Sequence, residues 1–348
     1  MRVSVYIPTF NRARFLAAAV ESALAQSEPP DEVLVVDDGS EDDTAAVLAA
    51  LRSPSLRIVR RPHEGLPRTR NFAISESTGD VLIALGSDDA LTPGAVAAHK
   101  RNFARDPGLD VSYGDWTVTD EHMVPRSRIR FQEWRGRSMA LLGRLALENA
   151  MPDGGTAIRR AVLERVGGYD ESFPRAQDYD FWSRALPGAS VGHCGETTLA
   201  YRWHSGNTSA PTVRYDVSYE ARIRERLVES YPPADLFPDV DFDRLRTLAA
   251  GRGIVIWGAG SLGRTILRVL ERAAVPVRAV ADANPALVGT TVSGVGVVAP
   301  STLTNAPAEQ RPFVLLASVK YPEMARELDS RGWLGGSDFE PFAELTYA

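Results

Sequence analysis

Short apolar runs alternate with amphipathic stretches along the first hundred residues. The apolar runs are of strand length and lie at residues 3–7, 32–37, 56–60 and 80–85. The run at residues 3–7 indicates a buried strand, and the run at 32–37 (EVLVVD) indicates a second apolar strand. The amphipathic stretches repeat at helical spacing and lie at residues 15–26, 44–51 and 69–77. This β–α–β–α rhythm predicts an α/β fold with a largely parallel sheet and helices on both faces.

The pattern becomes mixed after residue 110, with helices predicted near residues 161–166 and 178–186. Residues 209–250 are predicted to be a connection with one polar helix at 219–229, because the segment YPPADLFPDVD opposes regular structure. A new strand–turn–helix unit begins near residue 251. The predicted organisation is therefore a domain over residues 1–208, a linker over 209–250 and a second domain over 251–348.

Charge and cysteine content narrow the class of protein. The formal net charge of −6 gives no electrostatic support to a nucleic-acid partner. The one cysteine, Cys194, excludes an internal disulfide framework and fits a reducing compartment. No charged-then-apolar leader precedes the first strand, and no apolar run reaches the ~20 residues that span a bilayer. We expect a cytoplasmic protein without a membrane-spanning segment, free or peripheral to the inner face of the membrane.

Polar residues follow two of the predicted strands directly. Residues 8–12 (PTFNR) follow the first strand, and residues 37–40 (DDGS) end the second. Ligands of open α/β sheets collect at the carboxyl ends of strands, where a carboxylate accepts hydrogen bonds from a base or ribose and Phe10 can pack against a base. Taken alone, however, DDGS is also ordinary turn chemistry.

A third strand end carries two adjacent carboxylates. Residues 86–89 (GSDD) follow the apolar run that ends at Leu85. Carboxylates on a rigid strand end suit a hard divalent cation, with phosphate oxygens completing its shell. The alternative is that an aspartate here caps a helix starting near Thr92 and Pro93.

These motifs together resemble glycosyltransferase family 2, whose fold is called GT-A. The segments VSVYIPTFNR, SALAQ and EVLVVDDGSEDDT follow one another at the family's spacing, and Gly65, RNFA and Gly79 continue the match. The resemblance covers roughly residues 1–208. It implies a mixed sheet with helices on both faces and a nucleotide-diphosphate-sugar donor, usually linked to UDP. The contacts it implies for the nucleotide-sugar are Pro8, Phe10, Asn11, Arg12, Asp37, Asp38, Arg70, Asn71 and Asp88.

The resemblance also implies manganese or magnesium as cofactor. Asp89 would bind the metal and Asp88 would face the ribose or the metal. Gly86 stands where the family often has a first acidic residue, which removes one candidate ligand. His204, in a Tyr-Arg-x-His segment like that of related enzymes, would complete the metal shell or contact the diphosphate; the alternative is a structural histidine.

The family's catalytic base corresponds to Asp178, in the segment QDYDFWSR. Gln177 stands where glutamate is commoner. One base takes the proton of an acceptor hydroxyl while its oxygen displaces the diphosphate, and a single displacement inverts the anomeric configuration. The alternative for Asp178 is a helix cap, and Trp182 is either a core residue or an acceptor shelf. Gly154, Gly155 and Thr156 resemble the loop near the acceptor and donor sugar, although an ordinary turn has the same composition.

The C-terminal unit carries a dinucleotide fingerprint. Gly258, Gly260 and Gly263 separate a strand from a helix, and Asp282 follows the next strand. The unit has only about 100 residues, so the second half of a dinucleotide-binding domain is missing. We therefore rank a packing or homodimerising role of this small Rossmann-like unit above binding of another nucleotide or anion, and bound NAD(P) last.

The prediction is an inverting, metal-dependent glycosyltransferase that moves a sugar to a hydroxyl of a carbohydrate or small molecule. Two other classes stay open. An NAD(P)-dependent oxidoreductase would be governed by the C-terminal unit. A non-catalytic nucleotide-sugar sensor would explain the departures at Gly86 and Gln177.

Overall fold

The computed structural model describes residues 1–207, 218–318 and 320–343. These residues divide into two compact units. The first lies within Met1–Ser138 and Ala150–Tyr219, and the second within Met139–Asn149 and Glu220–Tyr347. The described residues contain no helix with the length and hydropathy needed to cross a membrane.

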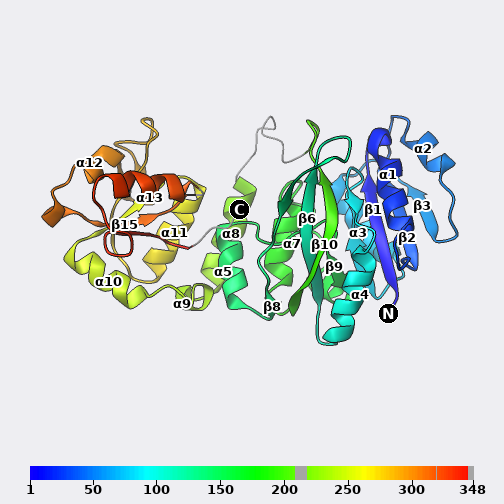
Figure 1. The fold of residues 1–348 in the computed structure, drawn as a ribbon, viewed down its shortest axis with the longest axis horizontal. Helices are drawn as coiled ribbons and strands as arrows, with labels where there is room; N and C mark the ends of the chain where they lie inside the picture. Colours follow the sequence, from blue (N-terminus) through cyan, green and yellow to red (C-terminus); the bar gives the residue numbers. More distant parts are fainter. Residues whose placement is uncertain (208–217, 319, 344–348) are drawn as a thin grey trace. The chain divides into compact units, whose positions relative to one another are not determined.

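The first unit is built on a ten-stranded mixed sheet with the order β3-β2-β1-β4-β9-β6-β10-β5, in which β7 also pairs with β6 and β8 with β10. Its strands are β1 (Val3–Thr9), β2 (Glu32–Asp37), β3 (Leu56–Arg60), β4 (Val81–Ala84), β5 (Ala90–Leu91), β6 (Val111–Thr119), β7 (Pro125–Ile129), β8 (Arg135–Gly136), β9 (Ala157–Arg159) and β10 (Val191–Arg202). Figure 1 shows this sheet with its helices.

The direction of the strands brings several chain segments to one edge of the sheet. Strands β1 to β4 are parallel, as the β–α–β–α rhythm predicts. Strand β9 runs antiparallel to both β4 and β6, so the sheet is mixed. The carboxyl ends of β1, β2 and β4 therefore lie at the same edge as the start of β9, which the loop with Gly154 and Gly155 precedes.

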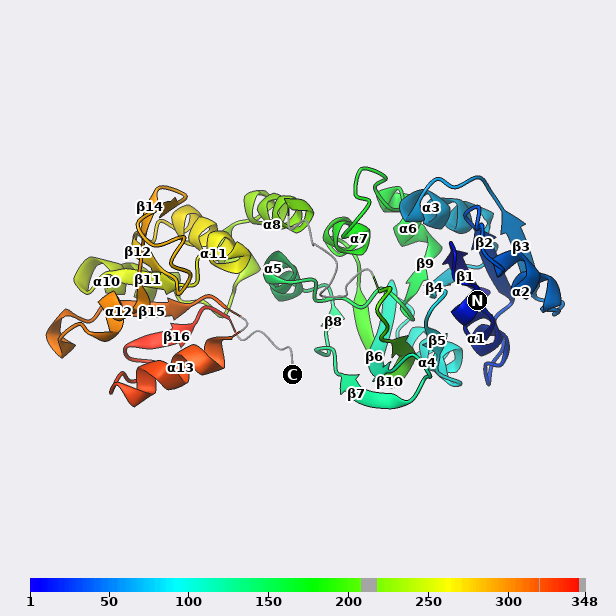
Figure 2. The same cartoon turned by 90° about the horizontal axis from the view of Figure 1, so that it is seen from above.

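Helices cover both faces of this sheet. They are α1 (Ala13–Leu24), α2 (Thr44–Ala50), α3 (Leu66–Glu76), α4 (Ala95–Arg105), α6 (Arg160–Val166) and α7 (Gln177–Ala185). Figure 2 shows α3, α6 and α7 along one face and α1 and α4 along the other. Helix α3 begins at Leu66, earlier than the predicted residue 69, because Pro67 lies in its first turn, where a missing N–H costs no hydrogen bond.

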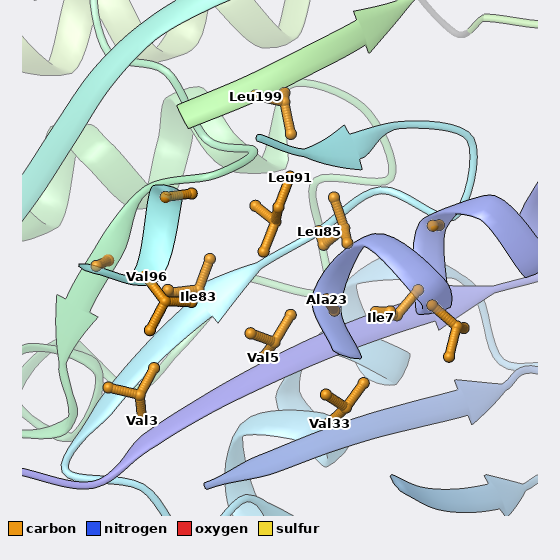
Figure 3. Packing of buried hydrophobic residues seen from close by; sticks show 14 of the residues in the cluster. Val3, Val5, Ile7, Ala23, Val33, Ile83, Leu85, Leu91, Val96 and Leu199 are labelled. Carbon is orange, nitrogen blue, oxygen red and sulfur yellow. The ribbon is translucent and has the colours of Figure 1, made fainter. Parts of the chain in front are cut away.

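The main core lies between the sheet and the helices α1 and α4. Alternate residues of β1, among them Val3, Val5 and Ile7, point into it, together with Ile83 of β4 and Ala23 of α1 (Figure 3). The intervening residues of β1 are equally buried, because α3, α6 and α7 cover the other face. Burial on both faces is the physical reason that apolar residues predominate in this strand.

The second unit contains a mostly parallel six-stranded sheet with the order β13-β14-β12-β11-β15-β16. Its strands are β11 (Ile254–Trp257), β12 (Val277–Ala281), β13 (Thr291–Val292), β14 (Val295–Val298), β15 (Phe313–Leu316) and β16 (Phe339–Pro341). Its helices are α5 (Met139–Leu147), α8 (Ser218–Ser230), α9 (Pro233–Leu236), α10 (Phe242–Gly251), α11 (Ser261–Arg272), α12 (Pro300–Thr304) and α13 (Tyr321–Ser330), with a short 3-10 turn at Ala308–Gln310.

The region predicted as a linker over residues 209–250 has more structure than its composition suggests. Residues 209–217 lie outside the described residues. Helices α8 to α10 follow and, from Glu220 on, lie within the second unit. The proline-rich segment contains α9, which the sequence analysis did not expect; Pro233 fits because it stands in the first turn of that helix.

Candidate active site

Asp37 ends β2 as a buried carboxylate with unused hydrogen-bonding capacity. Its Oδ1 accepts a hydrogen bond from the Ser40 N–H at 2.9 Å. Its Oδ2 lies 3.5 Å from the Arg60 Nε but accepts no hydrogen bond among the described residues, although only 1% of the residue is exposed. Buried carboxylate oxygens are almost always hydrogen-bonded in folded proteins. Asp37 Oδ2 can therefore accept a further hydrogen bond.

Unlike Asp37, Asp38 uses both of its carboxylate oxygens to accept hydrogen bonds from a neighbouring loop. Its Oδ1 accepts the Glu64 N–H at 3.0 Å, and its Oδ2 accepts the Gly65 N–H at 2.9 Å and lies 2.8 Å from His63 Nδ1. The carboxylate thus shapes the loop that leads into α3. Gly39 permits this arrangement, since a β-carbon there would lie only 2.8 Å from the backbone nitrogen of His63.

Hydrogen bonds and an ion pair connect the turn after β1 to the segments that follow β2 and β4. Pro8 lies inside β1. The Asn11 N–H donates to Ser40 Oγ at 2.9 Å, and its Oδ1 accepts the Glu41 N–H at 2.8 Å, which ties this turn to the DDGS turn. On the other side the Arg12 Nε lies 3.6 Å from Asp88 Oδ2.

Phe10 forms a contact that the sequence analysis missed. Its ring stacks on the His63 imidazole with the centroids 4.0 Å apart and the planes 21° from parallel. Both side chains are partly exposed, at 36% for Phe10 and 54% for the side chain of His63. The one sequence feature that could have indicated a role for His63 is its position two residues before Gly65, in the loop whose N–H groups Asp38 binds.

Asp88 and Asp89 converge on the space beside Gly86. A β-carbon on Gly86 would lie 3.1 Å from Asp88 Oδ1 and 2.8 Å from Asp89 Oδ2. A side chain at this position would fill the space between the two carboxylates, and glycine leaves it open. Burial and then the neighbouring Asp88 carboxylate raise the pKa of Asp89 well above its ordinary value.

The last residue of β10, Arg202, and His204 just after the strand hold these two carboxylates in place. The Arg202 N–H donates to Asp89 Oδ1 at 2.9 Å, and the Arg202 guanidinium donates to the Asp88 carbonyl at 2.6 Å. His204 Nε2 lies 3.1 Å from Asp88 Oδ2. Helix α4 begins only at Ala95, with Gly94 as its N-cap and no side-chain cap, so neither aspartate is the helix cap that the alternative interpretation required.

The groups that could bind a metal ion here are the carboxylates of Asp88 and Asp89, which are hard oxygen ligands. Among the described residues, no three His, Cys, Asp or Glu side chains are arranged to hold a metal ion by themselves. Two carboxylates around an open space nevertheless fit magnesium or manganese, which take one or two protein carboxylates and complete their shell with substrate phosphates and water.

Arg70 lies in a buried polar network that the sequence analysis did not foresee. Its guanidinium forms an ion pair with Asp153 at 2.8 Å and lies 4.8 Å from the centre of the Tyr169 ring. The Tyr169 hydroxyl donates to the second oxygen of Asp153 at 3.0 Å. Burial disfavours the Arg70 cation, but electrostatic interactions with Asp153, and less strongly with Tyr169, Tyr6 and Asp178, outweigh it, so the pKa of Arg70 lies above its ordinary value. Asn71 fixes this network by two 2.8 Å hydrogen bonds to the backbone of Tyr169.

Helix α7 places the predicted base and its neighbours. Gln177 is the first residue of the helix and Asp178 the second, while Ala176 is the N-cap with φ of 53°. Asp178 is therefore a first-turn acid and not the helix cap. Trp182 has an exposure of 0% and packs against Phe181, so it is a core residue and cannot serve as an acceptor shelf.

The loop from Gly154 to Thr156 is held by the surrounding elements. The Gly155 N–H donates to the Ala84 carbonyl at 2.9 Å, and Thr156 Oγ1 donates to the Pro152 carbonyl at 2.9 Å. The Trp116 indole N–H donates to the Gly154 carbonyl at 3.0 Å. This loop therefore stands at the end of β4, beside the aspartates that follow that strand.

The glycines of the C-terminal loop have packing reasons of their own. A β-carbon on Gly263 would lie 1.8 Å from the Gly258 carbonyl oxygen, and one on Gly258 would lie 2.5 Å from the Ala317 oxygen. A β-carbon on Gly260 would meet open space. The Asp282 carboxylate accepts the Ala259 N–H at 2.7 Å, so it already binds the loop itself.

Comparison with known proteins matches the N-terminal part of the chain. The family described as "Glycosyl transferase family 2" matches residues 4–167. An uncharacterized protein of Mycobacterium tuberculosis is 30% identical over 227 residues, which cover 61% of this chain and 70% of that protein. A chondroitin synthase of Pasteurella multocida is 29% identical over 212 residues, or 60% of this chain, but this chain spans only 21% of that enzyme's length.

Solved structures share the fold. S. aureus TarS 1–349 in complex with UDP-GlcNAc superposes with a TM-score of 0.53 at 19% identity, covering 80% of this chain and 84% of that one. The same protein in complex with UDP gives a TM-score of 0.52. This likeness confirms the predicted GT-A fold class. Taken with the relatives and the matched residues, it leads to one assignment: the chain belongs to glycosyltransferase family 2.

Proposed function

We propose that this glycosyltransferase transfers a sugar from a UDP-linked donor to a hydroxyl acceptor with inversion, assisted by manganese or magnesium. The observation that carries the proposal is the open space beside Gly86, on which the Asp88 and Asp89 carboxylates converge. Two adjacent carboxylates at this depth repel each other unless a cation lies between them. A nucleoside diphosphate brings a cation with it, because its own negative charge requires one.

The donor's base would lie at the ends of β1 and β2. The unused Asp37 Oδ2 is suited to accept the imide N–H of uracil. The Phe10–His63 stack forms an exposed aromatic edge at the end of β1. The binding of UDP and UDP-GlcNAc by TarS, which has the same fold, supports a uridine nucleotide.

Asp89 and Asp88 would hold the metal ion, with Asp89 oriented by the Arg202 N–H. When bound, the ion supplies Lewis-acid neutralisation of the charge on the leaving diphosphate. His204 is placed to hold Asp88 in position by its 3.1 Å contact. Arg12, at 3.6 Å from the same Asp88 carboxylate, adds positive charge beside the leaving group.

Asp178 would be the general base. The amide dipoles of the first turn of α7 favour its ionised form. In the reaction, the acceptor hydroxyl gives its proton to the Asp178 carboxylate while its oxygen forms a bond to the anomeric carbon. The bond from that carbon to the diphosphate oxygen breaks on the opposite side, and the nucleoside diphosphate leaves with the electron pair. One displacement of this kind inverts the anomeric configuration.

Calorimetry of UDP binding with and without manganese tests the metal assignment. We expect manganese to raise the UDP affinity of the wild-type protein by about tenfold or more, and Asp89→Asn to lose this gain. Asp43→Asn is the matched control, because Asp43 is an exposed aspartate near the same edge. An unchanged manganese effect in Asp89→Asn would remove Asp89 from the site.

Turnover of UDP-GlcNAc and other nucleotide sugars tests the base. Asp178→Asn should keep UDP affinity and lose transfer by a factor of about 10² to 10⁴, the usual contribution of a general base. Glu171→Gln, in an exposed carboxylate on the connection before α7, should retain transfer. Transfer at the wild-type rate by Asp178→Asn would refute its assignment as the base.

A further inference from the structure

Four aromatic side chains form one connected surface beside the candidate site. Trp116 of β6 stacks on Tyr201 of β10 at 5.4 Å with an interplanar angle of 16°. Phe131, which follows β7, packs on Trp116 in a T-shaped arrangement with the ring centroids 5.2 Å apart, and the centroid of Trp203 lies 6.3 Å from that of Tyr201. We call Trp116, Phe131, Tyr201 and Trp203 the aromatic shelf.

The shelf is anchored in the core and partly exposed at the surface. Trp116 and Tyr201 pack against the main core but are only partly buried. Trp203 has 45% of its surface exposed, although it is among the largest apolar side chains in the chain. Burying an aromatic ring is favourable, so a connected set of partly exposed rings indicates a surface that a ligand covers.

The shelf begins where the candidate active site ends. Trp203 lies between Arg202 and His204, which hold Asp89 and Asp88. At its other end the Trp116 indole donates a hydrogen bond to the carbonyl of Gly154. The shelf is therefore bonded to the loop before β9 and is adjacent in the chain to the residues that hold the carboxylates of the proposed metal site.

The lengths of the strands explain why the shelf projects beyond the sheet edge. Ala157 of β9 pairs with both Ile83 of β4 and Ser112 of β6. Strand β4 ends one residue after Ile83, whereas β6 continues to Thr119 alongside β10. Trp116 lies on this extension, beyond the end of β4. A ligand seated there would reach the site from the side opposite β2, where the base is proposed to bind.

We propose that the aromatic shelf binds a pyranose ring of the acceptor, so that the acceptor is a carbohydrate. The C–H faces of a pyranose are apolar and flat enough to lie on an aromatic ring, while the hydroxyls at its rim stay in water or reach the site. The proposal deepens the proposed function and rests on it. It also gives the acceptor a surface other than Trp182, for which the sequence left a core residue or an acceptor shelf open.

Fluorine NMR of the full chain labelled with 5-fluorotryptophan tests binding directly. The chain has six tryptophans, and Trp203→Phe and Trp116→Phe identify the two shelf signals. Cellotetraose, maltotetraose and chitotetraose are titrated to about 20 mM with UDP and manganese present, and glycerol phosphate serves as an acyclic control. We expect at least one tetrasaccharide to shift the Trp203 and Trp116 signals saturably and to leave those of Trp257 and Trp333, in the second unit, unchanged. Shelf signals that no tetrasaccharide moves, or that glycerol phosphate moves equally, would overturn the proposal.

Kinetics with the best tetrasaccharide as acceptor provides the second measurement. Trp203→Ala should raise KM for the acceptor by about tenfold with a much smaller change in kcat, and Trp203→Phe should restore part of the loss. Leu334→Ala is the matched control, because Leu334 is an exposed apolar residue, at 65%, in the second unit. An unchanged acceptor KM in Trp203→Ala would refute the shelf while leaving the transferase assignment intact. Saturable shelf binding without any sugar transfer would instead refute the proposed function alone.

Discussion

His99 connects the core of the first unit to the loop of the candidate site. Its Nε2 lies 2.8 Å from the Gly155 carbonyl oxygen and its Nδ1 lies 2.9 Å from Ser112 Oγ. A neutral ring satisfies both contacts, with the Nε2–H donating to Gly155 and Nδ1 accepting from the Ser112 hydroxyl. Burial lowers the pKa of His99 from 6.5 to about 4.

This depressed pKa predicts a loss of stability in mild acid. Between pH 6.5 and about 4 the unfolded chain binds a proton at His99 and the folded chain does not, so the free energy of unfolding falls as the pH falls through this window. The full difference is about 3 kcal/mol, and about 2 kcal/mol should be lost by pH 5. Urea unfolding at pH 7 and pH 5 measures it.

The controls for this prediction are two substitutions of histidine. His99→Gln should remove about 2 kcal/mol of the difference between pH 7 and pH 5. His122→Gln should keep the difference, because the side chain of His122 is 72% exposed on the surface. Identical pH dependence in His99→Gln and the wild-type protein would contradict the account.

At the scale of elements, α5 has the least expected position. Its residues lie in the middle of the region that resembles a glycosyltransferase, yet the helix belongs to the second unit. The contact with α9 is close, since a β-carbon on Gly143 would lie 1.8 Å from the Leu236 carbonyl oxygen. Glycine is required here because two helix backbones approach each other.

Gly143→Ala should therefore destabilise the second unit by about 2 kcal/mol or more, because the added methyl group overpacks a backbone contact. Gly251→Ala is the matched control: Gly251 is also helical, and its β-carbon would meet nothing within 4 Å. Hydrogen exchange measures the effect, with earlier loss of protection in α9 and α10 than in β1 and β4. Equal stability of the two variants would refute the close approach of α5 and α9.

At the scale of the whole molecule, the division into two units predicts a local response to ligand. UDP with manganese at about 100 times its dissociation constant should stabilise the unit that binds it by about 2.7 kcal/mol. If the donor binds as proposed, slowed hydrogen exchange should be confined to the first unit, within Met1–Ser138 and Ala150–Tyr219. Equal slowing throughout the second unit would contradict a donor site built by the first unit alone.

The sequence by itself determined the succession of strands and helices in the first unit and the polar residues at their ends. Strands are rich in apolar residues where helices cover them, and the residues that follow a strand are its neighbours in the chain, so both features are local. For this reason the bounds of β2 and β3 agree with the predicted ones. It also placed Asp37, Asp88 and Asp89 at strand ends, where the parallel direction of the strands brings them to one edge.

Only the tertiary structure decided which distant residues meet. The pairing of Arg70 with Asp153, the stack of Phe10 on His63 and the aromatic shelf each join segments that are far apart in the chain. The tertiary structure also places the Trp182 side chain in the core and helix α5 in the second unit. Periodicity states that a side chain is buried or exposed, but not against which partner, because the partner depends on how strands and helices pack in three dimensions.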